Sequence, residues 1–118
     1  MPTIRYVDEF QKEFDKFCKK HNNFEKDMDR FEAVLNTSWP KLLPGIIKIS
    51  NIGEKFCTCY KAREFRCKAL NRGSKSGIRI IFTYDEKISE FIFIELQFKG
   101  TDDNHDHNRL MRYAIRKT

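Results

Sequence analysis

The stretch FIFIELQF at residues 91–98 is the strongest strand signal in the sequence. It consists mainly of aromatic and β-branched residues, which favour extended backbone. Residues 78–84 (IRIIFTY) share this composition, and Asp85-Glu86-Lys87 supplies a tight turn between the two segments. Residues 56–70 alternate without a helix breaker and predict a third strand. The second half of the chain is therefore expected to form an antiparallel sheet.

The first half of the chain predicts two amphipathic helices. Apolar residues recur at helical spacing within 7–21 and again within 24–35, and polar residues occupy the remaining positions. The residues of the two apolar stripes are Phe10, Phe14, Phe17, Cys18, Phe24, Met28, Phe31 and Leu35. His21-Asn22-Asn23 provides a turn between the stripes, and Asn36-Thr37-Ser38 followed by Pro40 ends the second one. The pattern indicates an αα-hairpin.

The remaining segments complete an α+β fold. Residues 39–53 contain Pro and Gly among isoleucines and predict an irregular crossing with at most a short strand. A short basic helix is expected near the C-terminus, with Asp102 or Asp103 as its cap. We therefore expect an N-terminal αα-hairpin packed on a twisted antiparallel sheet of three or four strands, closed by that helix. The inner face should hold the helix stripes, and the outer face should hold cations.

Length and composition favour a single domain over residues 1–118. The chain has 118 residues and is 40% hydrophobic, which suffices for one modest core. It contains no apolar run of membrane-spanning length, and its first residues lack the pattern of a secretion signal. These features predict a cytoplasmic protein without a membrane partner. In a reducing compartment the four cysteines are expected to be free thiols.

The positive charge is concentrated between Lys61 and Arg79. This segment holds seven basic residues and one acid, so its net charge of +6 equals that of the whole chain. Such a field suits a polyanion, with RNA as the first candidate. In a strand, Arg66 and Lys68 point to the same face, and a hairpin around residues 71–77 would bring Arg79 to the level of Lys68. The charge alone is equally compatible with cations on a solvated sheet face.

The order of these motifs resembles that of the RelE-like toxins of the RelE/ParE superfamily. An αα-hairpin precedes Phe65-Arg66-Cys67-Lys68, a loop ends in Ser76-Gly77-Ile78-Arg79, and a strongly apolar strand and a short C-terminal helix follow. The similarity covers most of the chain in order, and its sharp motifs occupy about residues 60–100. Family members with RelE activity cut messenger RNA in the ribosomal decoding site with basic residues rather than a metal. The resemblance therefore implies metal-free cleavage without a cofactor.

Cleavage by a ribose 2′-OH requires a base, cations for the phosphorane charge and a donor for the leaving 5′-oxygen. The resemblance assigns Arg79 to phosphate stabilisation and Arg66 to the substrate backbone and its charge. Lys68 is assigned to proton abstraction or electrostatic support, and the sequence leaves open which residue is the base. The other cations of the segment are candidate RNA contacts: Lys61, Arg63, Arg72 and Lys75.

The chain departs from the family pattern after its last strand. Many relatives place Tyr or His there, whereas this chain has Gln97-Phe98-Lys99. Candidates for the missing acid and base-stacking aromatic are Lys99, His105, His107 and Tyr113. We retain Lys99 and His105 as catalytic candidates; the departure also leaves open that catalysis is weak or absent.

Other chemistry-bearing residues have simpler interpretations. His105-Asp106-His107 contains ordinary zinc ligands, but such residues at a helix start are usually solvated, and Cys57-x-Cys59 lacks the usual ligand spacing. No metal is therefore expected. Trp39, between a helix end and Pro40, is expected to pack as a lid on the core rather than to stack on a base.

Three functions remain open. The first is a toxin of a toxin-antitoxin system, a ribosome-dependent mRNA endoribonuclease that inhibits translation and is neutralised by an antitoxin covering its basic face. The second is a ParE-like inhibitor of DNA gyrase, which needs no nuclease residues. The third is a catalytically inactive module that binds RNA or the ribosome.

Overall fold

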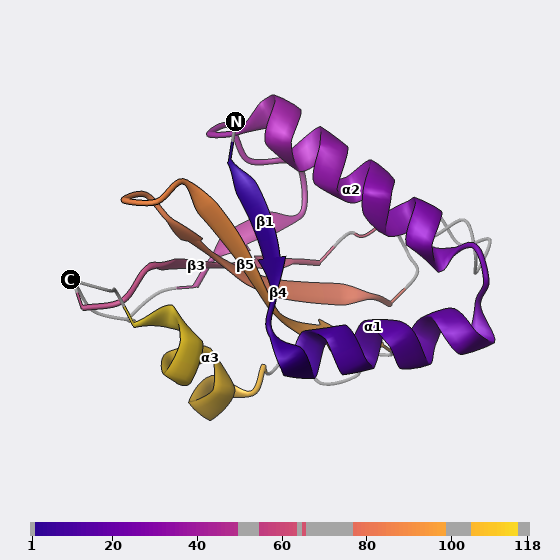
Figure 1. Cartoon of the computed structure of the whole chain (residues 1–118). Coiled ribbons are helices and arrows are strands. Elements are labelled where there is room, and N and C mark those ends of the chain that lie inside the picture. The colour runs from indigo at the N-terminus through magenta and orange to yellow at the C-terminus, as the bar shows by residue number, and fades with distance from the viewer. Residues whose placement is uncertain (1, 50–54, 64, 66–76, 99–104, 116–118) are drawn as a thin grey trace.

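The computed structural model describes residues 2–49, 55–63, 65, 77–98 and 105–115. Its elements are β1 (Thr3–Tyr6), α1 (Asp8–Lys20), α2 (Phe24–Ser38), β2 (Ile46–Lys48), β3 (Thr58–Ala62), β4 (Arg79–Asp85), β5 (Glu90–Gln97) and α3 (His107–Ala114) (Figure 1). The α+β class predicted from the sequence is confirmed. No helix in these described ranges combines the length and apolar character needed to cross a membrane.

The sheet has five strands in the order β1-β5-β4-β3-β2. β1 runs parallel to β5, with Thr3 opposite Glu90, while the other neighbouring strands are antiparallel. The prediction of three or four antiparallel strands is therefore wrong in number and in type. The missed strand β1 has four residues, too few to show a period, and its partner lies near the other end of the sequence.

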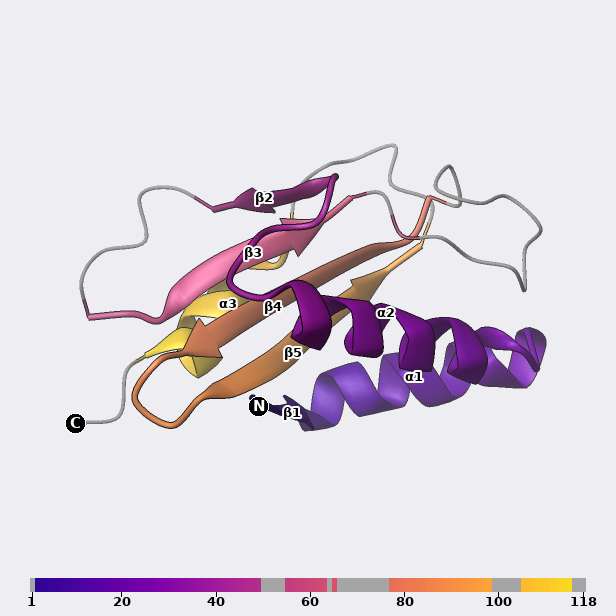
Figure 2. The same ribbon diagram turned by 90° about the horizontal axis from the view of Figure 1, so that it is seen from above.

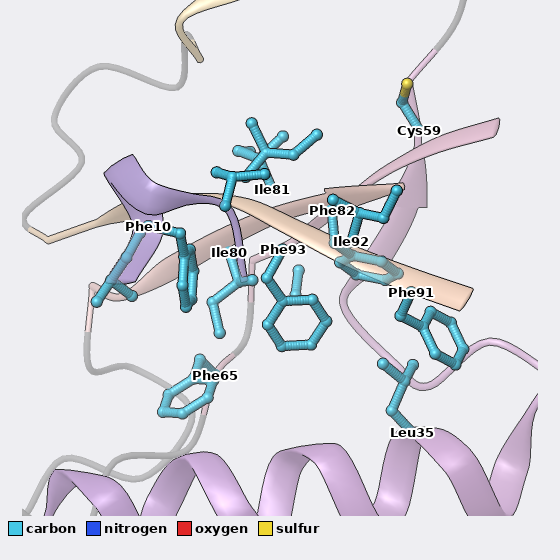
Figure 3. Close-up of a cluster of buried hydrophobic side chains, with 14 of the residues drawn as sticks. Phe10, Leu35, Cys59, Phe65, Ile80, Ile81, Phe82, Phe91, Ile92 and Phe93 are labelled. Atoms are coloured by element: carbon cyan, nitrogen blue, oxygen red, sulfur yellow. The ribbon is translucent and has the colours of Figure 1, made fainter. Parts of the chain in front are cut away.

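The helical hairpin forms as the apolar stripes predict. Phe10, Phe24, Met28 and Leu35 are fully buried, and the other stripe residues are partly buried against the same core. Figure 2 shows α1 and α2 on the same side of the sheet. In Figure 3, Ile80 and Phe93 project from the sheet toward α2 and Phe65 lies on that same side, whereas Ile81 lies on the opposite side. The core between the hairpin and the sheet is therefore largely aromatic.

A β-bulge changes which residues of β5 face the hairpin. Phe82 pairs with Phe93, but Ile81 pairs with Glu95, so Ile94 is the extra residue. Residues opposite each other in a ladder share a face. Phe93 therefore faces the hairpin, while Glu95 lies with Ile81 on the other face. The backbone N–H of Asp106, just before α3, donates to Glu95 Oε1 at 2.8 Å, which places the start of α3 on that second face.

We call this second surface the α3 face and define it by Lys61, Arg79, Ile81, Glu95 and Gln97. Lys61 pairs with Ile81 and Ile81 with Glu95, so these three residues form one row across β3, β4 and β5. Arg79 pairs with Gln97 in the next row that shares this face. The residues between the two rows, Ile80 and Leu96, pair with each other and face the hairpin.

Several predicted boundaries shift in the structure. β3 begins at Thr58 and ends at Ala62, which pairs with Ile80; of the strand expected over 56–70, residues 64 and 66–70 lie outside the described residues. The loop after β4 is longer than Asp85-Glu86-Lys87 and runs from 86 to 89, with Lys87 N–H donating to Asp85 Oδ1 at 3.0 Å. The cap of α3 is Asp106, not Asp102 or Asp103, because its Oδ1 accepts from Arg109 N–H at 3.1 Å.

Candidate functional site

Arg79 occupies the first position of β4 and lies beside Gln97 of β5. Gly77, two residues earlier, has a φ of 81°, which lies in the left-handed region of backbone conformation. Glycine adopts this region at little steric cost because it has no side chain. The glycine of the Ser76-Gly77-Ile78-Arg79 motif thus permits the backbone turn that leads into the strand. Ile78 is fully buried next to it and fixes the strand start to the core. The half-buried Arg79 side chain is consequently held on a well-packed strand rather than on a loop.

The two residues that replace the expected Tyr and His separate onto opposite sides of the sheet. Gln97 lies on the α3 face beside Arg79, and its Nε2 donates to Glu95 Oε2 at 3.1 Å. Phe98 packs instead against Phe17 of α1, with ring centroids 5.3 Å apart. Of these two side chains, Gln97 alone therefore lies next to Arg79, and its amide does not act as a general acid or base at neutral pH.

Lys61 lies on the α3 face but is only 7% exposed. Its Cα is two strands away from that of Glu95, about 10 Å at ordinary strand spacing. Burial on a β-strand keeps the ammonium group close to the sheet. Its positive charge is nevertheless felt at His105, whose pKa it helps to lower. The structure thus positions Lys61 as a fixed source of positive potential more than as an exposed RNA contact.

His105 stands directly before the cap of α3. Its Nε2 lies 3.2 Å from Nδ1 of His107. Burial lowers the pKa of His105 below its ordinary value, and the electrostatic effects of Lys61 and His107 lower it further; Glu95 and Asp106 oppose this shift. A lowered pKa keeps the imidazole neutral at pH 7, so it can accept a proton or donate the one it carries.

Helix α3 is fastened to α1 by two acidic residues that the helical pattern showed only as solvated positions. Glu13 Oε1 accepts from Arg109 Nη1 at 2.9 Å and from the backbone N–H of Leu96 at 3.1 Å. Glu9 accepts a hydrogen bond from the Tyr113 hydroxyl and pairs with Arg112 at 3.3 Å. Because Tyr113 is engaged at this helix contact, it is a less suitable acid than His105.

The remaining predicted residues divide between described and undescribed parts of the chain. Arg63 is exposed just beyond β3, and its backbone N–H donates to Gly45 O at 2.9 Å. The other predicted cations lie outside the described residues: Arg66, Lys68, Arg72, Lys75 and Lys99. That Lys68 lies opposite Arg79 across two paired strands therefore stays a prediction.

Trp39 belongs to the core rather than to the site, as expected. Its ring lies 4.7 Å from Phe91 and 4.8 Å from Tyr84, measured between centroids, and 5.4 Å from Tyr60. These three residues come from β5, β4 and β3, so the indole covers the sheet at the end of α2.

The α3 face and the start of α3 together present four functional groups. They are the guanidinium of Arg79, the buried ammonium of Lys61, the neutral imidazole of His105 and the carboxylate of Glu95. The guanidinium of Arg79 can contact a phosphate, the buried ammonium of Lys61 adds positive potential, and the imidazole of His105 can move a proton. Within the described ranges, no group of three or more His, Cys, Asp or Glu side chains is arranged to hold a metal ion. Cys18, Cys57 and Cys59 are free thiols.

Comparison with known proteins gives no relative. No family model matches the chain, and neither does any curated protein or solved structure. The resemblance to the RelE-like toxins therefore rests on the motifs of this sequence.

Proposed function

We propose that this chain is a RelE-like toxin that cuts ribosome-bound messenger RNA without a metal. The observation that carries the proposal is the position of Arg79 on a paired strand, on the sheet face that also holds Lys61 and the start of α3 with His105. This cleavage needs a cation that stabilises the phosphate charge and a group that transfers a proton, and both lie on one face. The motif resemblance at residues 60–100 supplies the substrate class.

In the proposed reaction the ribose 2′-oxygen bonds to the adjacent phosphorus, and the bond from phosphorus to the 5′-oxygen breaks. The proton of the 2′-OH passes to a base, and the leaving 5′-oxygen receives a proton. The products are a 2′,3′-cyclic phosphate and a 5′-hydroxyl end. Arg79 stabilises the phosphorane charge, and the neutral His105 serves one of the two proton transfers. The family pattern adds Arg66, Lys68 and Lys99 as further cations.

The proposal includes a partner and a compartment. A cytoplasmic toxin of this kind requires an antitoxin, and a protein that covers the α3 face would remove Arg79 from the substrate. Co-expression with the product of a neighbouring gene should then restore growth.

The decisive experiment compares Arg79→Ala with Arg5→Ala in a reconstituted translation system. Arg5 is a matched control because it pairs with Ile92, on the same sheet face but at the far end, where it forms an exposed ion pair with Glu90 at 3.1 Å. We expect Arg79→Ala to lower the cleavage rate by about 100-fold or more, the scale of one lost oxyanion donor. Arg5→Ala should stay within about threefold, because an exposed pair contributes little. Wild-type cleavage by folded Arg79→Ala would refute the proposal.

A specific observation favours a second candidate, a non-cleaving member of the same superfamily. The strand end beside Arg79 carries Gln97, and Phe98 packs against α1 instead of reaching the α3 face. The site would then bind without turnover, as a gyrase inhibitor or as an inactive RNA- or ribosome-binding module. Primer extension after induction separates the candidates. Uncut transcripts with DNA-damage signalling indicate gyrase inhibition, and uncut transcripts without it indicate the inactive module.

A further inference from the structure

A groove lies between α1 and the end of β5, on the side of the sheet away from Arg79. Its cavity volume is about 330 Å³, and Glu13, Lys16, Phe17, Lys20, His21, Leu96 and Phe98 line it. Leu96 faces the hairpin rather than the α3 face, because it pairs with Ile80. The groove is therefore separate from the proposed catalytic face, although the strand end at 96–98 contributes to both.

The floor of the groove is apolar and shaped like a corner. The rings of Phe17 and Phe98 meet at 68° with centroids 5.3 Å apart. Phe17 is held in turn by Phe24 at 4.4 Å and by the His21 ring at 4.6 Å. Phe98 is 39% exposed, a large aromatic surface left open at a strand end. An exposed aromatic in a concave, rigidly backed site is typical of an anchor pocket.

The rim of the groove is positively charged. Lys16 and Lys20 are exposed and one helical turn apart on α1, and neither forms an ion pair with a residue of the described ranges. Glu13, the acid of the lining, already accepts hydrogen bonds from Arg109 and from Leu96 N–H. A ligand in the groove would therefore meet the uncompensated positive charge of Lys16 and Lys20.

We propose that this groove docks a peptide segment of a partner protein, in which one large apolar side chain is flanked by carboxylates. The apolar side chain would fill the corner between Phe17 and Phe98, and the carboxylates would meet Lys16 and Lys20. A corner suits an inserted side chain better than a base, which stacks on a flat ring face. The site is independent of the proposed nuclease function, because it uses no residue of the α3 face.

The test titrates the full chain with a short fluorescein-labelled peptide that has a central leucine and glutamates on both sides, followed by fluorescence anisotropy. Lys16→Glu/Lys20→Glu should weaken binding by at least about tenfold, since two attractive charge contacts become repulsive. The matched control is Lys12→Glu/Lys19→Glu, which makes the same charge change at exposed positions of α1 outside the groove. The control should change affinity by no more than about threefold.

The apolar contribution is tested separately. Replacing the leucine of the peptide by serine, or Phe98 by Ser in the protein, should each cost about tenfold or more, because both remove the buried anchor contact. Backbone amide shifts in NMR spectra should move at Lys16, Lys20 and Phe98 and stay fixed at Arg79. Equal loss in both lysine pairs would overturn the proposal. So would an absence of peptide binding, or binding of oligouridylate in the groove in place of the peptide.

Discussion

Glu13 joins three elements through one carboxylate oxygen, so its replacement should affect far more than the surface of α1. Oε1 accepts from Leu96 N–H of β5 at 3.1 Å and from Arg109 of α3 at 2.9 Å. The side chains of Glu13 and Arg109 are 30% and 16% exposed, so water replaces these bonds only in part. Two variants separate the contributions: Glu13→Gln keeps an acceptor and removes the charge, whereas Glu13→Ala removes both.

The size of each effect follows from these contacts. A hydrogen bond to a charged group contributes about 1.5–3 kcal/mol, and an unsatisfied buried N–H costs about 1–3 kcal/mol. Arg109 keeps its bond to Ile94 O at 3.1 Å in either variant, which limits the loss. We expect Glu13→Ala to lower the free energy of unfolding by about 3 kcal/mol and Glu13→Gln by about 1 kcal/mol. At about 4 °C per kcal/mol for a domain of this size, Tm should fall by about 12 °C and about 4 °C.

Urea unfolding followed by circular dichroism measures these differences. Asp15→Asn is the matched control, because Asp15 also lies on α1 and, among the described residues, accepts a hydrogen bond from Gln11 alone, at 3.0 Å and exposed. It should cost less than about 0.5 kcal/mol. A double-mutant cycle with Arg109→Gln should show coupling of about 1 kcal/mol. Equal, small losses in Glu13→Ala and Asp15→Asn, or the absence of coupling, would refute the reasoning.

Three further expectations concern the core, the pH response and the thiols. Phe93 is fully buried among aromatic rings, so Phe93→Ala should lower the free energy of unfolding by about 3–5 kcal/mol in urea titrations; a loss under about 1 kcal/mol would contradict this packing. The pKa of His105 is lowered on folding, first by burial and then by Lys61, so its contribution to stability is complete above the unfolded pKa of about 6.5 and declines as pH falls below it. His105→Gln should reduce that decline, and Lys61→Met should raise the His105 pKa in an NMR titration. An unchanged pKa of His105 in Lys61→Met would exclude the electrostatic interaction between Lys61 and His105. Burial raises the pKa of the Cys59 thiol to about 12, so iodoacetamide should alkylate it at pH 8 only after unfolding, as mass spectrometry can show; rapid alkylation of the folded protein would contradict the burial.

The parts of the fold that the sequence predicts are those specified by local periodicity. Phe24, Met28 and Leu35 recur at helical spacing along α2, and a helix that buries one stripe needs no information from distant residues. The strand segments at 79–85 and 90–97 are recognisable for the same reason, since their composition favours extended backbone. β1 is different, because its four residues become a strand only by pairing with β5.

The candidate site shows the same division between local and long-range information. Arg79 could be identified from its motif, and Gln97 from its place at the end of the last strand. The sides on which the residues of β5 lie could not be identified, because simple alternation along FIFIELQF puts Glu95 and Gln97 on the face of Phe93. The extra residue Ile94 shifts that alternation and moves both polar side chains to the α3 face. A bulge of this kind depends on pairing with β4, and the sequence of β5 alone does not specify that pairing.

The bulge is held in place by the same ion pair that fastens α3. Arg109 donates to the carbonyl of Ile94, the extra residue, and its partner Glu13 accepts from the N–H of Leu96 two residues later. The two side chains thus satisfy one backbone group of the bulge residue and one just after it, on the edge of β5 where β1 no longer pairs. Without them, a plain ladder that placed Gln97 on the hairpin face would compete more effectively. The arrangement of Arg79 beside Gln97 therefore depends on Glu13, a residue of α1 on the other side of the strand.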